Sequence, residues 1–103
     1  KKQKIEEKKY TKWFDYDKIK NSPCVRTRRQ GDYLTVNSEG GKKKLNRIFI
    51  DEKIPAEMRD RIPVVAAGSE ILWIPGGRMN EKYKITSTTG RVLELHYQGG
   101  ALA

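Results

Sequence analysis

The sequence contains one cysteine and one histidine, and these low counts limit the chemistry that it can support. Cys24 alone cannot form an intrachain disulfide, and no cysteine-rich zinc site can be built around it. His96 lies on the polar side of an alternating segment, so we expect an exposed imidazole rather than a general base. We therefore expect no metal site in this chain, and a buried free thiol at Cys24.

Long hydrophobic runs and nucleotide-binding loops are also missing. No apolar run approaches the ~18 residues of a membrane-spanning helix, and no signal-peptide pattern is present. Gly40 and Gly41 precede three lysines without the spacing of a phosphate-binding loop. Asp51 and Glu52 are bracketed by cations, which favours surface ion pairs over an acid–base dyad. These features predict a cytoplasmic chain with no catalytic residues, no cofactor and no membrane partner.

Positive charge is abundant, and it is concentrated in two regions. The chain has 22 Lys and Arg against 13 Asp and Glu, a net charge of +9, and an isoelectric point near 9.8. Residues 1–12 hold six Lys and two Glu, and residues 26–47 hold seven basic and two acidic side chains. The rest of the chain is close to neutral. Focused positive charge favours a polyanionic partner, and nucleic acid comes first because its phosphates can be neutralised.

Length and composition predict one folded domain with a lean core. The 103 residues are 36% hydrophobic and 34% charged, and they include two Trp, five Tyr and two Phe. Residues 1–12 are expected to form a charged linker or the end of a preceding helix, and residues 13–103 to form the domain. Because the chain starts without Met in a Lys/Glu-rich stretch, we expect it to be part of a longer polypeptide.

The hydrophobic periodicity predicts an α+β fold, a compact β-rich sandwich of about five strands with a short helical hairpin. Leu45, Ile48 and Phe49 have the i, i+3, i+4 spacing of a buried helical stripe in a helix that starts near Lys43. Pro55 suits the first turn of a second short helix. Trp73 is expected in the core, whereas Trp13 is left open between core and surface. The expected extended segments are 24–29, 33–36, 64–67, 70–74, 83–86 and 91–97.

Two basic clusters joined by a glycine-containing loop form a candidate phosphate-binding surface. Arginine can contact phosphate in a bidentate manner, and lysine acts as a point charge. A solvated surface charge is the simplest interpretation of any single one, but their grouping favours a shared contact. The candidates are Arg26, Arg28, Arg29, Lys42, Lys43, Lys44, Arg47, Arg59 and Arg61. Of these, Arg28, Arg29, Lys43 and Lys44 are expected on one electropositive face.

Two carboxylates near these cations are expected to be structural. Asp32 closes the first basic cluster, and Asp60 lies between two arginines. We expect Asp60 to form an ion pair with Arg59, Arg61 or an arginine of the first cluster. Such a pair would orient the cation.

The basic segments resemble the C-terminal domain of bacterial tRNA(Ile)-lysidine synthase. The resemblance covers roughly residues 13–97, almost the whole chain. It rests on residues 25–32 (VRTRRQGD), 43–45 (KKL), 49–55 (FIDEKIP), 59–63 (RDRIP), 70–76 (EILWIPG) and 91–93 (RVL). The most specific part of the resemblance is the motif IDEKIP followed by RDRIP.

The resemblance implies both a fold and a function. The implied fold is a compact α+β sandwich related to a module of the phenylalanyl-tRNA synthetase β subunit. The implied function is that of a non-catalytic tRNA-binding domain in the ATP-dependent ligase that attaches lysine to the wobble cytidine of a minor isoleucine tRNA. The acceptor-stem region of the tRNA is the expected contact. ATP and magnesium are expected to serve the catalytic domain of the same polypeptide, not this chain.

Other functions stay open on the sequence alone. The chain could be a protein–protein module that docks onto the catalytic domain or forms a homodimer. It could also be a generic RNA-binding domain without a role in tRNA modification. An exposed apolar patch would favour the protein–protein module.

Overall fold

The computed structural model describes residues 10–98 of the chain. Residues 1–9, most of the expected linker, lie outside the described residues, and the first strand already begins at Thr11. In chain order the elements are β1 (Thr11–Asp15), η1 (Tyr16–Lys18), β2 (Cys24–Arg26), β3 (Tyr33–Thr35), β4 (Lys42–Lys44), α1 (Leu45–Asp51), α2 (Ala56–Arg59), β5 (Val64–Ala67), β6 (Glu70–Trp73), η2 (Glu81–Tyr83) and β7 (Val92–His96). Here η denotes a 3₁₀ helix.

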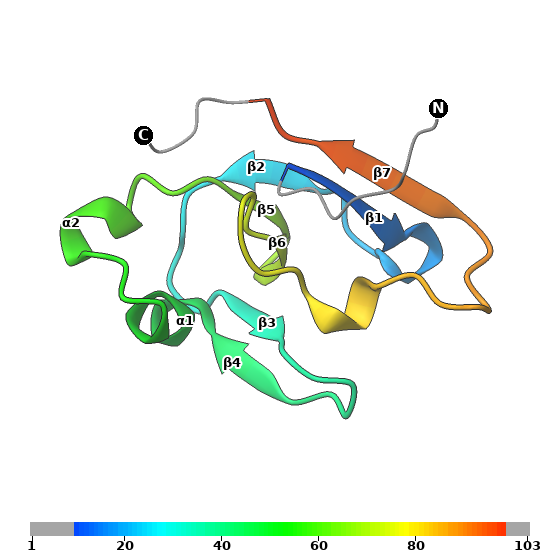
Figure 1. Ribbon diagram of the computed structural model, residues 1–103, viewed down its shortest axis with the longest axis horizontal. Coiled ribbons are helices and arrows are strands. Elements are labelled where there is room, and N and C mark those ends of the chain that lie inside the picture. Colours follow the sequence, from blue (N-terminus) through cyan, green and yellow to red (C-terminus); the bar gives the residue numbers. More distant parts are fainter. Residues whose placement is uncertain (1–9, 99–103) are drawn as a thin grey trace, which may run out of the picture.

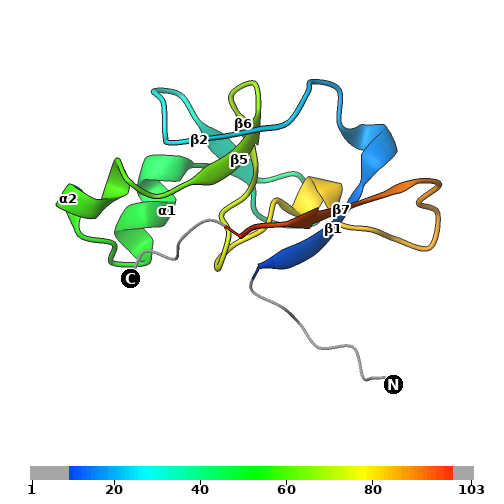
Figure 2. The same ribbon diagram turned by 90° about the horizontal axis from the view of Figure 1, so that it is seen from above.

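The strands form two sheets. The larger has the order β2-β5-β6-β3-β4, in which only β3 and β6 are parallel neighbours. The smaller pairs β1 with β7 antiparallel, so that Thr11 faces His96 and Asp15 faces Val92. Both α-helices lie at one end of the molecule, and η1 lies at the other end (Figures 1 and 2). The expected α+β class is confirmed, although the described residues form seven strands and not about five.

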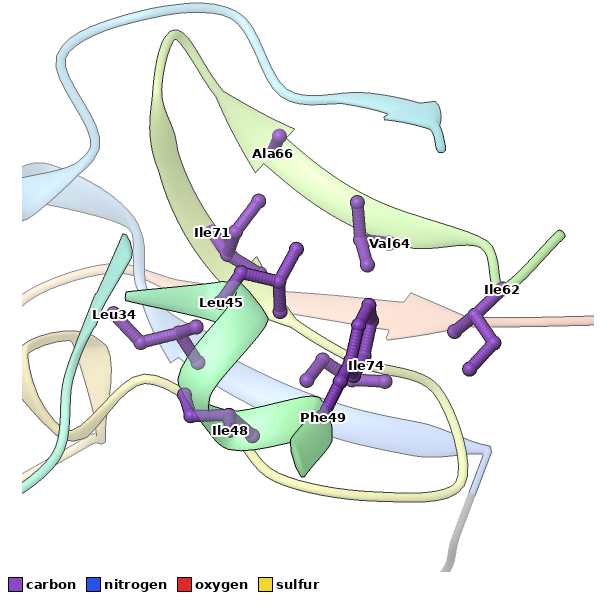
Figure 3. Packing of buried hydrophobic residues seen from close by; sticks show 9 residues of the cluster. All are labelled: Leu34, Leu45, Ile48, Phe49, Ile62, Val64, Ala66, Ile71 and Ile74. Carbon is purple, nitrogen blue, oxygen red and sulfur yellow. The ribbon is translucent and has the colours of Figure 1, made fainter. Parts of the chain in front are cut away.

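A first hydrophobic core joins α1 to one face of the larger sheet. Leu45, Ile48 and Phe49 are each 1% exposed, as their helical spacing predicted. They point towards Val64 and Ile71 of the sheet (Figure 3). This packing fixes α1 against the sheet and leaves the remaining helix positions at the surface.

A second core joins the opposite face of the larger sheet to the β1–β7 pair. Phe14 and Trp73 are fully buried, and their ring centroids are 6.0 Å apart. Leu93 and Leu95 of β7 pack against this cluster. The domain therefore has three layers: α1, the five-stranded sheet and the two-stranded sheet. The expected burial of Trp73 is confirmed.

The corner between the two helices forms where the sequence predicted it. Lys53 adopts a positive φ of 61° directly after the C-cap of α1, a conformation that ends many helices. The Ile54 amide donates to the Phe49 carbonyl at 2.9 Å. Pro55 then directly precedes α2.

Some local predictions were wrong. Residues 83–86 do not form a strand, because the buried Asn80 side chain accepts a hydrogen bond from the Lys82 amide and starts η2 instead. Lys42–Lys44 form β4, although the sequence favoured a helix from Lys43. Cys24 is exposed, not buried, because β2 is a short strand at the edge of its sheet.

Candidate nucleic-acid interface

Arg28 connects the three cationic segments of the chain. Its Nε donates to Oδ1 of Asp60 at 2.8 Å, and its Nη1 donates to Oδ1 of Asn46 at 2.7 Å. Arg28 lies in the loop after β2, Asn46 lies in the first turn of α1, and Asp60 follows α2. The two contacts therefore hold these segments side by side. The ion pair expected for Asp60 is present, with an arginine of the first cluster as its partner.

Arg26 is turned inward and fixes the shape of the same loop. Its Nη1 and Nη2 each donate to a carboxylate oxygen of Asp32 at 2.9 Å, and Nη2 also donates to the Gly68 carbonyl. The side chains of Arg26 and Asp32 are only 9% and 1% exposed. The hydrogen bond to Asp32 raises the pKa of Arg26 above its usual range. Asp32 also accepts from the Arg29 amide at 2.7 Å, so this buried pair orients the exposed part of the loop.

Lys43 and Arg47 share one carboxylate. Lys43 Nζ lies 2.6 Å from Oδ2 of Asp51, and Arg47 Nε lies 3.1 Å from Oδ1. The hydrogen bond from Lys43 is the main cause that lowers the pKa of Asp51. The pair attaches β4 to the last turn of α1. It also confirms that Asp51 serves a surface ion pair.

The three lysines of β4 do not share a face. Because successive side chains of a strand alternate, Lys42 and Lys44 project to one side and Lys43 to the other. Lys42 Nζ lies 5.3 Å from the ring centroid of Tyr33, and Lys44 is the cross-strand partner of Tyr33. The alternation separates Lys43 from Lys44, contrary to the expectation of one common face.

Arg59 has a structural contact as well. Its Nε donates to the Ile54 carbonyl at 2.9 Å. This contact stabilises the turn between the two helices. Arg59 is half-buried, so less of its guanidinium is open to a ligand.

Three of the candidate cations make no hydrogen bond, ion pair or ring contact among the described residues. Within residues 10–98, the side chains of Arg29, Lys44 and Arg61 have no hydrogen-bond or ion-pair partner, and all three are exposed. Arg29 follows Arg28, Lys44 precedes α1 by one residue, and Arg61 follows Asp60. In the sequence, each of the three is therefore one or two residues from a residue of the Arg28 contacts. We call Arg28, Arg29, Lys44 and Arg61 the basic surface.

Asn46 is a contact residue of the candidate interface that sequence reasoning missed. It carries no charge, and nothing in its own type distinguishes it from a solvated helix residue. Its position off the apolar stripe, next to Lys44 and Arg47, is the only signal that could have indicated it. Only the fold reveals that it accepts a hydrogen bond from Arg28.

The described residues contain neither a cluster of metal ligands nor a membrane-spanning helix. No group of three His, Cys, Asp or Glu side chains in residues 10–98 could hold a metal ion. Within the same range, no helix is long and apolar enough to cross a membrane. Both observations concern only this part of the chain.

Several known proteins similar to this chain belong to one family. The family model described as "TilS substrate C-terminal domain" matches residues 24–95. A tRNA(Ile)-lysidine synthase of Caldanaerobacter subterraneus subsp. tengcongensis is 51% identical over 88 residues, which are 85% of this chain and 19% of that protein. The corresponding protein of Clostridium tetani is 41% identical over 90 residues, 87% of this chain and 19% of that protein. The chain thus spans about a fifth of the length of these curated relatives.

A solved structure gives the same relationship in three dimensions. The crystal structure of a TilS C-terminal domain superimposes with a TM-score of 0.70 at 29% identity. The match covers 98% of this chain and 79% of the other. The basic surface therefore lies within a fold that has already been observed by experiment.

Proposed function

Because this chain belongs to the family of C-terminal domains of tRNA(Ile)-lysidine synthase, we propose that it is a non-catalytic tRNA-binding domain. The whole enzyme would be the ATP-dependent ligase that attaches lysine to the wobble cytidine of a minor isoleucine tRNA in the cytoplasm. The tRNA and the catalytic domain of the same polypeptide would be its partners. ATP and magnesium would belong to that catalytic domain.

The observation that supports this proposal most strongly is the double contact of Arg28. It joins three segments that are far apart in sequence and rich in cations, at Asn46 and Asp60. A protein that only needed solubility would gain nothing from collecting like charges at one place. Collected cations repel one another unless an anion is bound, so a polyanionic ligand is the physical explanation.

The basic surface suits a base-paired RNA stem. The deep, narrow major groove of A-form RNA keeps side chains from the base edges, so a stem is recognised by shape and by phosphate and 2′-hydroxyl contacts. Exposed Arg29, Lys44 and Arg61 supply the charge, while Arg26 and Asp32 fix the loop that presents Arg29. The acceptor-stem region is the proposed contact.

Electrophoretic retention of minor isoleucine tRNA by the chain tests the proposal. Elongator methionine tRNA is the competitor, because the two tRNAs have the same overall shape. We expect both to be retained at low salt, and minor isoleucine tRNA to be retained to higher salt. A chain that retains neither tRNA at low salt would contradict the proposed function.

A further inference from the structure

A cleft lies near the C-terminal end of α1, whereas the Arg28 contacts lie at its N-terminal end. The cleft has a volume of about 630 Å³, within the ~300–1,000 Å³ usual for small-ligand sites. The cleft lies between β1, the turn after β6 and the segment around η2. Its walls include Trp13, Glu52, Arg78, Met79, Lys84 and Ile85. Neither the predicted phosphate contacts nor the proposed function uses it.

The apolar wall of the cleft offers a surface for a flat ring. Trp13 is only partly buried, in contrast to the fully buried Trp73. Met79 lines the same cleft, and Ile85 is 46% exposed there. An indole beside exposed aliphatic side chains is the kind of platform on which nucleobases stack in proteins that bind single strands.

Arg78 lines the cleft, and among the described residues no hydrogen bond to a neighbouring carboxylate holds its guanidinium. Its Nε is buried and has no hydrogen-bond partner, and the nearest carboxylate oxygen, Oε2 of Glu52, is 3.9 Å away. That separation is too long for a hydrogen bond. The Arg78 side chain as a whole is 36% exposed, so a part of it other than Nε is open to a ligand in the cleft. The backbone of Arg78 is held independently, since its carbonyl accepts from the Ile74 amide at 2.9 Å.

Charge favours an anionic ligand such as a nucleotide over an apolar or cationic one. Lys84 Nζ lies 2.8 Å from Glu81 at the rim, so that carboxylate is already neutralised. In all, the lining holds three cations, Lys12, Arg78 and Lys84, and two carboxylates, Glu52 and Glu81. A phosphate can meet the cations, and base edges can exchange hydrogen bonds with arginine and carboxylate groups.

The position of the cleft links it to the basic surface. Asn46 lies in the first turn of α1, and Glu52 is the C-cap of the same helix. A seven-residue helix is about 10 Å long, so the two sites are within reach of one RNA molecule. We propose that the cleft binds an unpaired nucleotide adjoining the base-paired stem that contacts the basic surface. This inference takes its ligand class from the proposed function, but it concerns separate residues.

Binding of three RNA probes by the chain tests the inference. The probes are a short blunt duplex, the same duplex with a single-stranded extension at one end, and the extension alone. We expect the extension to tighten binding of the duplex about tenfold, the usual effect of a stacked base. It should also quench tryptophan fluorescence, and Trp13→Phe should abolish the quenching because Trp73 is buried in the core.

Variants separate the cleft from the basic surface. Arg78→Ala should remove the gain from the extension and leave the affinity for the blunt duplex unchanged. Lys82→Ala, a cation next to the cleft that does not line it, is the matched control and should retain the gain. Lys44→Ala should weaken binding of both duplexes and keep their ratio.

Each result bears on one proposal or the other. If the blunt duplex binds and the extension adds neither affinity nor quenching, the cleft inference is wrong while the proposed function stands. If only the extension binds and Arg78→Ala abolishes this, the cleft inference holds and the basic surface does not bind stems. If no probe binds, both proposals are overturned.

Discussion

Arg28 donates its Nε–H to Oδ1 of Asp60 at 2.8 Å, across a separation of 32 positions in the sequence. Arg28 is 25% exposed and Asp60 is 79% exposed in their side chains. A pair this open to water contributes little to stability. Its value lies in the placement of the guanidinium, which also reaches Asn46.

Removal of the Asp60 charge tests this positioning role, because the two accounts predict opposite changes in RNA affinity. Asp60→Asn makes the chain more positive, so a purely electrostatic account predicts tighter RNA binding. Because the amide binds the Arg28 guanidinium less strongly than the carboxylate does, we expect weaker binding by several-fold, measured by retention of tRNA at fixed salt. Glu57→Gln, on α2 and also exposed, is the matched control and should bind slightly more tightly. Tighter binding by both variants would remove the positioning role.

The Arg26–Asp32 pair should matter for stability and not directly for RNA contact. Asp32→Ala leaves a nearly buried guanidinium without its partner, and such a loss costs about 3–5 kcal/mol in the free energy of unfolding. Urea denaturation followed by tryptophan fluorescence measures it. Asp60→Ala, which breaks an exposed pair, should cost less than about 1 kcal/mol. If the two variants lose the same free energy of unfolding, burial of the Arg26–Asp32 pair does not raise its contribution to stability.

Titration of Asp51 tests the shared carboxylate. Its pKa lies below the ordinary value of 3.8, chiefly because of the hydrogen bond from Lys43. The stabilisation is therefore fully present above that ordinary value and is lost as the pH falls through the lowered pKa. In Lys43→Ala, carbon-13 NMR of the carboxyl group should show the pKa rising towards 3.8. Arg47→Ala should raise it less, and an unchanged pKa in Lys43→Ala would contradict the contact.

Sequence periodicity predicted much of the fold. The stripe of Leu45, Ile48 and Phe49 and the corner at Pro55 follow from helix geometry and proline chemistry, which act within a few residues. The extended segments 64–67 and 70–74 were predicted for the same reason, as was the polar side of β7 that carries His96. Local sequence rules are enough to predict an element when one of its faces is buried and the other is exposed to solvent.

Other features depend on contacts that no local pattern records. The segment after Asn80 has the composition of a strand, yet a buried side chain caps a 3₁₀ helix there. Cys24 is exposed because its strand happens to be an edge, which only the sheet order reveals. The cleft could not be predicted at all, since Trp13 and Arg78 are 65 positions apart in the sequence.

The candidate site was predicted as a set of cations but not as an arrangement. Composition indicated which segments carry charge, and the structure assigns them different tasks. Arg26 is held by Asp32 and Lys43 by Asp51, whereas Lys44 is exposed without such a partner among the described residues. Sequence cannot make this division, because it depends on which carboxylate folds against which cation.

The salt dependence of tRNA binding tests the central claim most directly. The variant carries Arg29→Ala and Lys44→Ala, and the control carries Lys20→Ala and Lys82→Ala. Lys82 lies at the η1 end, where its carbonyl accepts a hydrogen bond from Lys18, and Lys20 follows η1. Each lost phosphate contact should reduce the slope of log K against log salt by about 0.9. We predict a reduction of about 2 for the variant and none for the control, whereas equal slopes for both would show that the basic surface does not contact the phosphates.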